Sequence, residues 1–199
     1  MKTNTRKPFI GIFGKRNNGK SSLVNCLAGQ EVAIVSDVAG TTTDPVRKTV
    51  EIGGIGPVVL VDTAGIDDTG VLGEKRIAAA RKIINTVDLA LLVITRAQPD
   101  DYDHELIAQF AEADVPYIIV NNKIDIFPVH EQLVERLSDV HHVPVITFNA
   151  LKPENKEQLV NMIRQSIPDS VWRPATLVGD LISYGDTVLL ITPIDIEAP

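Results

Sequence analysis

Cysteine is nearly absent from this chain, since Cys26 is the single one among 199 residues. One cysteine excludes both a disulfide framework and a cysteine-based metal cluster, so we expect Cys26 to be a small core residue. No apolar run approaches the roughly 18 residues that indicate a membrane-spanning helix. The segment 1–7 is polar and basic and lacks the hydrophobic stretch of a secretory signal. These absences predict a globular protein of the cytoplasm.

An excess of positive charge is also missing. The net charge is −7 and the sequence pI is ≈ 5.1, which argues against a broad nucleic-acid-binding surface, because such surfaces are normally basic. The same charge does not exclude an anionic ligand, because a glycine-rich loop supplies a local positive field from its own backbone N–H groups.

Short apolar runs recur along the chain and predict the strands of a sheet. The clearest runs lie at 9–13, 57–61, 89–94 and 117–120, with a weaker run at 143–146 and an alternating one at 48–52. Segments in which apolar residues have helical spacing separate most of these runs. The alternation predicts an α/β fold with a doubly wound, mostly parallel six-stranded sheet, helices on both faces and ligand loops at the carboxyl ends of the strands.

The segment after the first apolar run fits the phosphate-loop pattern G-x-x-x-x-G-K-[ST], through Gly14, Lys15, Arg16, Asn17, Asn18, Gly19, Lys20 and Ser21. A glycine-rich turn between a strand and a helix lets backbone N–H groups converge on a polyphosphate, and the helix N-terminus adds partial positive charge. In this pattern Lys20 reaches the β- and γ-phosphates, and the Ser21 hydroxyl holds Mg²⁺. The segment therefore predicts a P-loop NTPase.

Two further motifs follow predicted strands. Asp62 and Gly65 fit D-x-x-G, in which the acid holds Mg²⁺ through water and the glycine N–H meets the γ-phosphate. Asn122, Lys123 and Asp125 fit N-K-x-D. A carboxylate at Asp125 can accept hydrogen bonds from both N1–H and N2–H₂ of guanine, whereas adenine would leave it unpaired. The three motifs together predict a site for GTP and GDP.

This set of motifs resembles the translation-factor-like GTPases, and Gly40 to Asp44 resembles the G-T-T-x-D segment of the branch with tRNA-modification and ribosome-assembly GTPases. The resemblance implies that Thr42 completes the Mg²⁺ shell and senses the γ-phosphate. Asn149 departs from the serine of the family's S-A-[LK] motif, while Ala150 keeps the N–H that meets guanine O6. The implied nucleotide contacts are Gly14, Asn17, Asn18, Gly19, Lys20, Ser21, Ser22, Asp62, Gly65, Asn122, Lys123, Asp125, Asn149, Ala150 and Leu151.

The same resemblance bears on hydrolysis, for which it implies Lys20, Thr42, Gly65 and Glu74 as catalytic residues. Ile66 stands where Ras-like proteins have a water-orienting glutamine, so we expect slow hydrolysis. The tRNA-modification relatives use K⁺, which implies a K⁺ site made by the Asn17 side chain and the carbonyls of Ser36 and Val38. The alternatives are a loop hydrogen bond for Asn17 and, for Glu74, an acid at a helix N-terminus.

Within this branch the chain resembles the FeFe-hydrogenase maturation GTPases, the HydF family, in the segments 14–22, 34–46 and 62–68, and in the tail segments 179–182, 185–186 and 193–199. That resemblance implies slow GTP hydrolysis that gates assembly of a metallocluster, with a hydrogenase and other maturation proteins as partners. The family's dimerisation domain and iron–sulfur cluster domain are not expected in this chain. Whether the chain forms a homodimer is left open. We expect a flexible tail over 1–7, a GTP-binding domain over 8–168, and over 169–199 a linker and strand leading to a further domain.

Two other functions are compatible with the same motifs. One is a tRNA-modification or ribosome-assembly GTPase that binds RNA directly, against which the acidic composition argues. The other is a nucleotide-gated interaction module whose hydrolysis is incidental. The apolar run at 187–191 also leaves two interpretations open, a strand that pairs elsewhere or a final edge strand of the main sheet.

Overall fold

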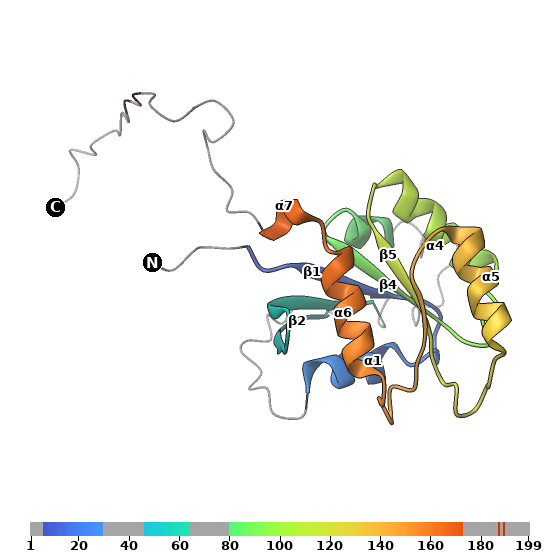
Figure 1. Ribbon diagram of the computed structural model, residues 1–199. Helices are drawn as coiled ribbons and strands as arrows, with labels where there is room; N and C mark the ends of the chain where they lie inside the picture. Colours follow the sequence, from blue (N-terminus) through green and yellow to red (C-terminus); the bar gives the residue numbers. More distant parts are fainter. Residues whose placement is uncertain (1–5, 30–45, 64–79, 173–186, 188, 190–199) are drawn as a thin grey trace.

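The computed structural model describes residues 6–29, 46–63, 80–172, 187 and 189, and these form one sheet with helices packed on both faces (Figure 1). The strand order is β2-β3-β1-β4-β5-β6. The strands are β1 (Phe9–Phe13), β2 (Val46–Ile52), β3 (Gly56–Asp62), β4 (Leu89–Ile94), β5 (Tyr117–Asn121) and β6 (Val145–Thr147). Only the β2–β3 pair is antiparallel, while the other four neighbouring pairs are parallel. The predicted six-stranded, mostly parallel sheet is confirmed.

The helices divide between the two faces of the sheet. The described helices are α1 (Lys20–Ala28), α4 (Asp101–Glu112), α5 (Glu131–His141), α6 (Lys156–Ser166) and α7 (Asp169–Trp172), and a further helical stretch covers 80–84. Buried residues of α1, α6 and α7 join one apolar cluster, whereas those of 80–84, α4 and α5 join another. Figure 1 shows α1 and α6 on the opposite side of the sheet from α4 and α5. The sheet is therefore doubly wound.

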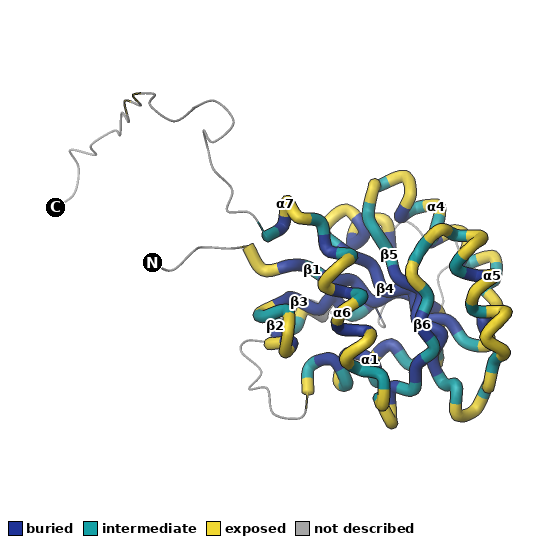
Figure 2. The backbone as a smooth tube through the Cα atoms, in the orientation of Figure 1, coloured by how far each residue is buried: buried dark blue, intermediate teal, exposed yellow. Residues whose placement is uncertain are grey.

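The central strand β4 shows why its sequence is apolar without alternation. All six of its residues are buried. Leu89, Leu91 and Val93 belong to the cluster under α1 and α6, while Ala90, Leu92 and Ile94 belong to the cluster under α4 and α5. Successive side chains of a strand point to opposite faces, and both faces are covered here, so every position must be apolar. Figure 2 shows this buried centre between the exposed outer surfaces of the helices.

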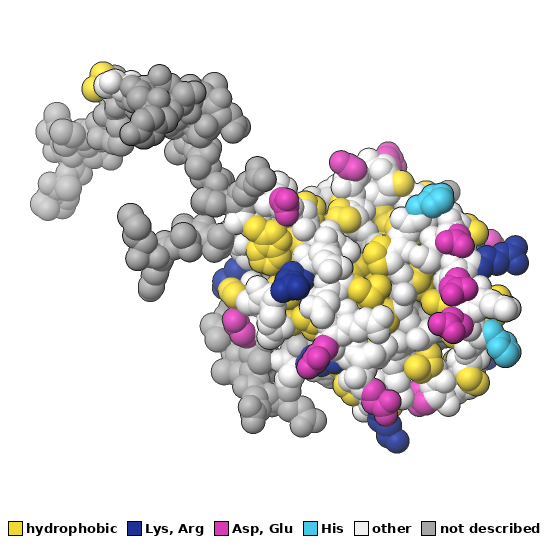
Figure 3. Space-filling model, viewed as in Figure 1, with side chains coloured by type: hydrophobic (Ala, Val, Ile, Leu, Met, Phe, Trp, Pro, Cys, Tyr) yellow, Lys and Arg dark blue, Asp and Glu magenta, His cyan; other side chains and the backbone are white. Residues whose placement is uncertain are grey.

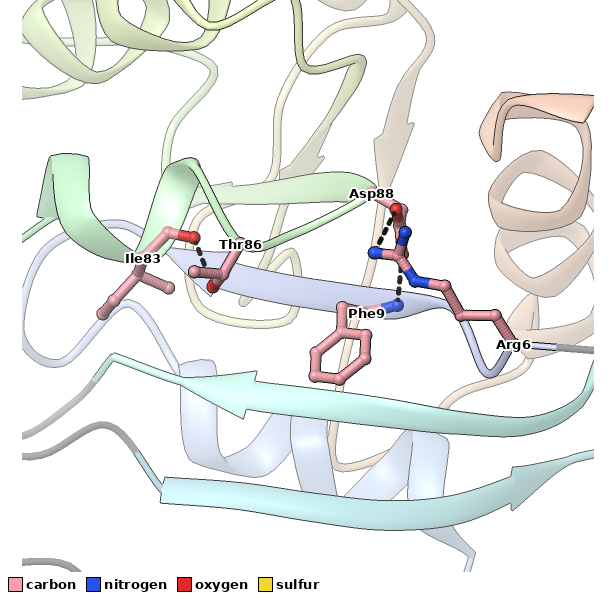
Figure 4. Close-up of polar contacts among 5 residues, drawn as sticks. All are labelled: Arg6, Phe9, Ile83, Thr86 and Asp88. Atoms are coloured by element: carbon pink, nitrogen blue, oxygen red, sulfur yellow. Dashed lines mark hydrogen bonds and ion pairs between the residues drawn. The ribbon is translucent and has the colours of Figure 1, made fainter. Parts of the chain in front are cut away.

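The beginnings of β1 and β4 are fastened together by one carboxylate (Figure 4). The Phe9 N–H donates to Asp88 Oδ2 at 2.8 Å, and the Arg6 guanidinium pairs with Asp88 Oδ1 at 3.1 Å. Nearby, the Thr86 hydroxyl donates to the Ile83 carbonyl at 2.8 Å and closes the end of the helical stretch 80–84. These contacts set the start of β1, the strand that leads into the phosphate loop.

The predicted domain boundaries are only partly covered by the described residues. The helix α7 lies directly after 168, and of the predicted strand at 187–191 only Thr187 and Leu189 are described. The boundaries at 7 and 168 therefore stay predictions. Among the described residues, none of the helices has both the length and the apolar content to cross a membrane.

Candidate functional site

The predicted motifs meet at the carboxyl edge of the sheet. The strands β3, β1, β4 and β5 are parallel neighbours in that order, so their carboxyl ends lie side by side. The phosphate loop follows β1, Asp62 ends β3, and Asn122 follows β5. In doubly wound sheets this edge is where ligands bind. The topology thus brings together motifs that are separated by more than forty and more than one hundred residues in the chain.

The phosphate loop passes so close to its neighbours that two of its positions require glycine. Gly14 has φ 126°, and a Cβ there would lie 2.2 Å from the Val93 carbonyl oxygen. Gly19 has φ 92°, and a Cβ there would lie 2.3 Å from Asn122 Nδ2. Only glycine combines this left-handed backbone with such close approach. The two glycines of the motif are therefore explained by the fold before any ligand is considered.

Lys20 is the buried cation of the site, with 4% of its surface exposed. Its ammonium donates to the Gly14 carbonyl at 2.5 Å and to the Lys15 carbonyl at 2.9 Å. It borders a cavity of ≈ 350 Å³ that is lined by Arg16, Asn17, Gly19, Lys20, Ser21, Ser22 and Lys123. The cavity carries three basic side chains, and α1 begins at one of its lining residues, Lys20, so its chemistry suits an anion.

Ser21 and Asp62, the described residues predicted to hold Mg²⁺, are brought together. The Ser21 hydroxyl donates to Asp62 Oδ2 at 3.3 Å. A hydroxyl and a carboxylate are hard oxygen donors, which are the ligands that Mg²⁺ prefers. The pair therefore fits this ion. The hydroxyl of Thr63, next along the chain, donates to the Ile12 carbonyl at 2.7 Å and fixes the end of β3 against β1.

Asn122 joins the phosphate loop to the segment 149–151. Its Nδ2 group donates to the Asn18 carbonyl at 2.9 Å, and its Oδ1 accepts from the Ala150 N–H at 3.1 Å. The side chain is 2% exposed. In this structure the oxygen and the nitrogen of the Asn122 side chain both bond to other parts of the protein. The Ala150 N–H, which we expected to meet guanine O6, donates to Asn122. The sequence motif did not indicate this bracing role.

The departure at Asn149 preserves a turn. Its Oδ1 accepts from the N–H groups of Leu151 and Lys152, at 3.0 and 3.3 Å. Asparagine and serine both form side-chain turns of this kind, serine more weakly. Across the site, Lys123 has φ 61°, and its carbonyl accepts from the N–H groups of Ile126 and Phe127, at 3.0 and 2.8 Å. Asp125 lies on this turn and is exposed.

Several predicted site residues lie outside the described residues. They are Ser36, Val38, Thr42, Gly65 and Glu74. Their roles in Mg²⁺ binding, K⁺ binding and hydrolysis stay predictions. Asn17 is described, with φ 65°, and lies exposed at the mouth of the cavity. Asparagine tolerates this left-handed backbone, so the local turn alone is also compatible with its presence.

The end of β4 and the loop that follows it contact the site in a way that the sequence did not indicate. The Asn18 amide donates to the Val93 carbonyl at 2.8 Å, and Lys15 of the phosphate loop pairs with Asp100, the N-cap of α4. The Asp100 carboxylate also accepts from the N–H groups of Tyr102 and Asp103, and the Lys15 ammonium contributes to holding the pKa of Asp100 below its ordinary value. The start of α4 is therefore tied to the phosphate loop.

Asp103 is buried beside this ion pair at a cost to stability. It is 2% exposed, its Oδ2 accepts from the Asp100 N–H, and its Oδ1 has no hydrogen-bond partner in the described structure. Burial raises the pKa of Asp103 from 3.8 to about 6, and the neighbouring Asp100 charge adds to the rise. Because the folded chain holds this proton more tightly than the unfolded chain does, the free energy of unfolding falls as pH rises from about 4 to about 6.

We therefore expect Asp103→Asn to stabilise the fold at pH 7.5. The amide can still accept from the Asp100 N–H, and the desolvated charge is gone, so the free energy of unfolding rises by about 1 to 3 kcal/mol. The gain shrinks at pH 4.5, where the native carboxyl is already protonated. Urea unfolding at the two pH values measures it, with the exposed neighbour Asp101→Asn as control. A gain that is equal at both pH values contradicts this account.

Comparison with known proteins finds similarity to GTPases. The sequence model of a family described as 50S ribosome-binding GTPase matches residues 9–123. The chain is 45% identical over 121 residues to the tRNA modification GTPase MnmE of Coxiella burnetii (strain Dugway 5J108-111), covering 59% of this chain and 26% of that protein. It is 37% identical over 167 residues to GTPase Der of Wolinella succinogenes, covering 79% of this chain and 34% of that protein. The matched part thus spans about a quarter to a third of these relatives.

A solved structure of Era has the same fold. It contains MgGDPNP and nucleotides 1506–1542 of 16S ribosomal RNA, and it matches this chain with a TM-score of 0.62 and 30% sequence identity. The match covers 83% of this chain and 58% of that one.

Proposed function

The chain belongs to the 50S ribosome-binding GTPase family, and from that premise we propose that it binds GTP through its described phosphate and guanine motifs and hydrolyses it slowly to GDP. The observation that carries the proposal is the position of Lys20, a buried ammonium held by two carbonyls of the phosphate loop. An ammonium restrained in this way loses little side-chain freedom when it meets a phosphate oxygen, which favours binding of the triphosphate.

The described residues divide the task between the two ends of the nucleotide. Lys20 and the backbone N–H groups of the loop hold the phosphates, and Asp125 accepts from the guanine edge. GTPases of this family normally use Mg²⁺, which Ser21 and Asp62 would hold and which would neutralise charge on the phosphate oxygens. Asn122 fixes the phosphate loop relative to the segment 149–151, because its side chain bonds to both.

The proposal is tested by titrating the chain with GTP, GDP and ATP in the presence of Mg²⁺ by calorimetry. We expect GTP and GDP to bind, and ATP to bind more weakly by roughly 10³-fold or more. Adenine has no pair of N–H donors for the Asp125 carboxylate, which would stay without its hydrogen bonds. Equal binding of ATP and GTP, or no binding of either, would refute the proposal.

We propose that K⁺ stimulates hydrolysis through Asn17. The proposal is supported by the resemblance to tRNA-modification GTPases and by the place of Asn17 at the mouth of the cavity. We expect GTP turnover to be about tenfold or more faster in K⁺ than in Na⁺, since the cation replaces an arginine finger worth at least about 10³-fold. Asn17→Ala should turn over GTP equally slowly in both salts.

A direct control keeps the K⁺ experiment interpretable. Asn161→Ala removes an asparagine from α6, outside the nucleotide cavity, and should keep the full stimulation. If stimulation by K⁺ survives in Asn17→Ala, the cation site is assigned to the wrong residue, and the left-handed turn accounts for the asparagine instead.

The named relatives support a tRNA-modification or ribosome-assembly role better than a hydrogenase-maturation role. The two relatives described above are named MnmE and Der, and the Era structure holds 16S ribosomal RNA. We therefore propose RNA or a ribosomal particle as the partner class whose binding the nucleotide state controls.

Hydrogenase maturation remains a second candidate because one observation favours it. The net charge is −7, and on the face shown in Figure 3 the Lys and Arg side chains of the described residues are scattered among acidic ones. Phosphate backbones are normally bound by a continuous basic surface. Binding of a short ribosomal RNA hairpin in 150 mM salt, weakening steeply as salt rises, would support the first candidate. No binding with either nucleotide would support the second.

A further inference from the structure

The loop from 95 to 100, between β4 and α4, has a backbone that needs external support. Arg96 has φ 65° and Ala97 has φ 50°, so two consecutive residues other than glycine lie in the left-handed region. Such conformations persist only where the surrounding structure holds them, and they cluster at functional sites. The contacts of Arg96 and Ala97 therefore show which part of the structure supports the loop.

Both contacts lead to the segment that carries the N-K-x-D motif. The Ala97 N–H donates to Asn121 Oδ1 at 2.8 Å, and Asn121, which is fully buried, directly precedes the motif. The Arg96 guanidinium lies over the Phe127 ring, 4.2 Å from its centroid. Phe127 comes two residues after Asp125. The loop therefore contacts residues on both sides of the guanine motif.

Phe127 closes the turn on which Asp125 lies. Its N–H donates to the Lys123 carbonyl at 2.8 Å, beside the Ile126 N–H at 3.0 Å, and Lys123 itself is left-handed. A planar guanidinium stacks well on an aromatic face, and the cation is attracted by the ring electrons. Arg96 thus restrains the ring, and the ring restrains the turn between Lys123 and Phe127.

We propose that Arg96 is a positioning residue for guanine selection. Stacked on Phe127, it holds the turn 123–127 in the conformation that presents Asp125 to the base, without touching the nucleotide itself. The inference rests on the proposed function, since it concerns how the guanine-reading carboxylate is held.

The experiment measures dissociation constants for GTP and ITP, together with GTP turnover, in the wild type and in Arg96→Ala. We expect GTP to bind about two- to fivefold more weakly to the variant, which is the range of a cation–π contact at an exposed position. ITP lacks the N2 amine and makes one bond fewer to Asp125, so its binding should weaken less than that of GTP. The ratio of the ITP to the GTP dissociation constant should therefore be smaller in Arg96→Ala than in the wild type. The turnover number should not change, because the phosphate end is intact.

Matched variants separate positioning from general stability. Phe127→Leu should produce the same loss as Arg96→Ala, and the double variant should lose no more than either, because the two residues act through one contact. Arg96→Lys keeps a cation near the ring and should retain part of the selectivity. Arg81→Ala removes another exposed arginine, paired with Glu112 away from the site, and should leave both dissociation constants unchanged.

The outcomes distinguish this inference from the proposed function. If the wild type does not prefer GTP over ATP, the proposed function fails. If the wild type is selective but Arg96→Ala binds GTP and ITP as the wild type does, or weakens both by the same factor, only the positioning role is overturned. A lower melting temperature with unchanged dissociation constants overturns it as well.

Discussion

Replacing Lys20 by alanine is expected to weaken GTP and GDP binding by about 10²-fold or more. The ammonium is buried and fixed by the carbonyls of Gly14 and Lys15, so its bonds to phosphate oxygens form without loss of side-chain freedom. A hydrogen bond between charged groups contributes roughly 1.5 to 3 kcal/mol, and the buried ammonium charge also attracts the second phosphate directly. Calorimetric titration with Mg²⁺ present measures the loss directly.

Two controls make the result specific to the phosphate site. Lys82→Ala removes an exposed lysine that does not line the cavity, and it should bind GTP as the wild type does. Lys20→Arg keeps a cation, but its planar guanidinium cannot replace a compact ammonium that donates to two carbonyls, so it should also bind GTP weakly. Normal GTP affinity in a folded Lys20→Ala protein would contradict the phosphate role assigned to this residue.

The sheet could be predicted because its signal is local. Each parallel strand is a short apolar run, and β4 reads as continuously apolar because both of its faces are covered. The weaker run at 143–146 was less well placed, since β6 has three residues, Val145–Thr147, and only Ile146 is buried. Its position depends on pairing with β5, which the run itself does not encode.

The contacts that organise the site could not be predicted in the same way. Asn122 binds the Asn18 carbonyl across 104 positions of sequence, and its motif indicated only a contact to the nucleotide. The stacking of Arg96 on Phe127 joins the loop 95–100, which carries no recognisable motif, to the segment that carries the N-K-x-D motif. Asp103 belongs to none of the motifs, and its burial depends on how α4 packs. Such features arise only when loops from different strands meet.

The second large effect is expected at the base. Asp125→Asn should weaken GTP binding by roughly 10³-fold, because the carboxamide places an N–H₂ donor against the N2–H₂ donor of guanine. Xanthine carries a carbonyl oxygen at C2 instead, so its nucleotide regains a complementary pair of bonds. The variant should therefore bind XTP more tightly than GTP, the reverse of the wild type. Competition titration of both nucleotides on both proteins measures the reversal.

The reversal tests base selection separately from every other property of the site. A folding defect in Asp125→Asn would weaken both nucleotides and cannot produce a gain for XTP. Asp139→Asn makes the same chemical change on an exposed position of α5 and should leave the preference for GTP intact. If the Asp125→Asn protein loses GTP without gaining XTP, the carboxylate is not reading N1–H and N2–H₂. Guanine selection would then lie with the backbone of 149–151, which Asn122 holds in place.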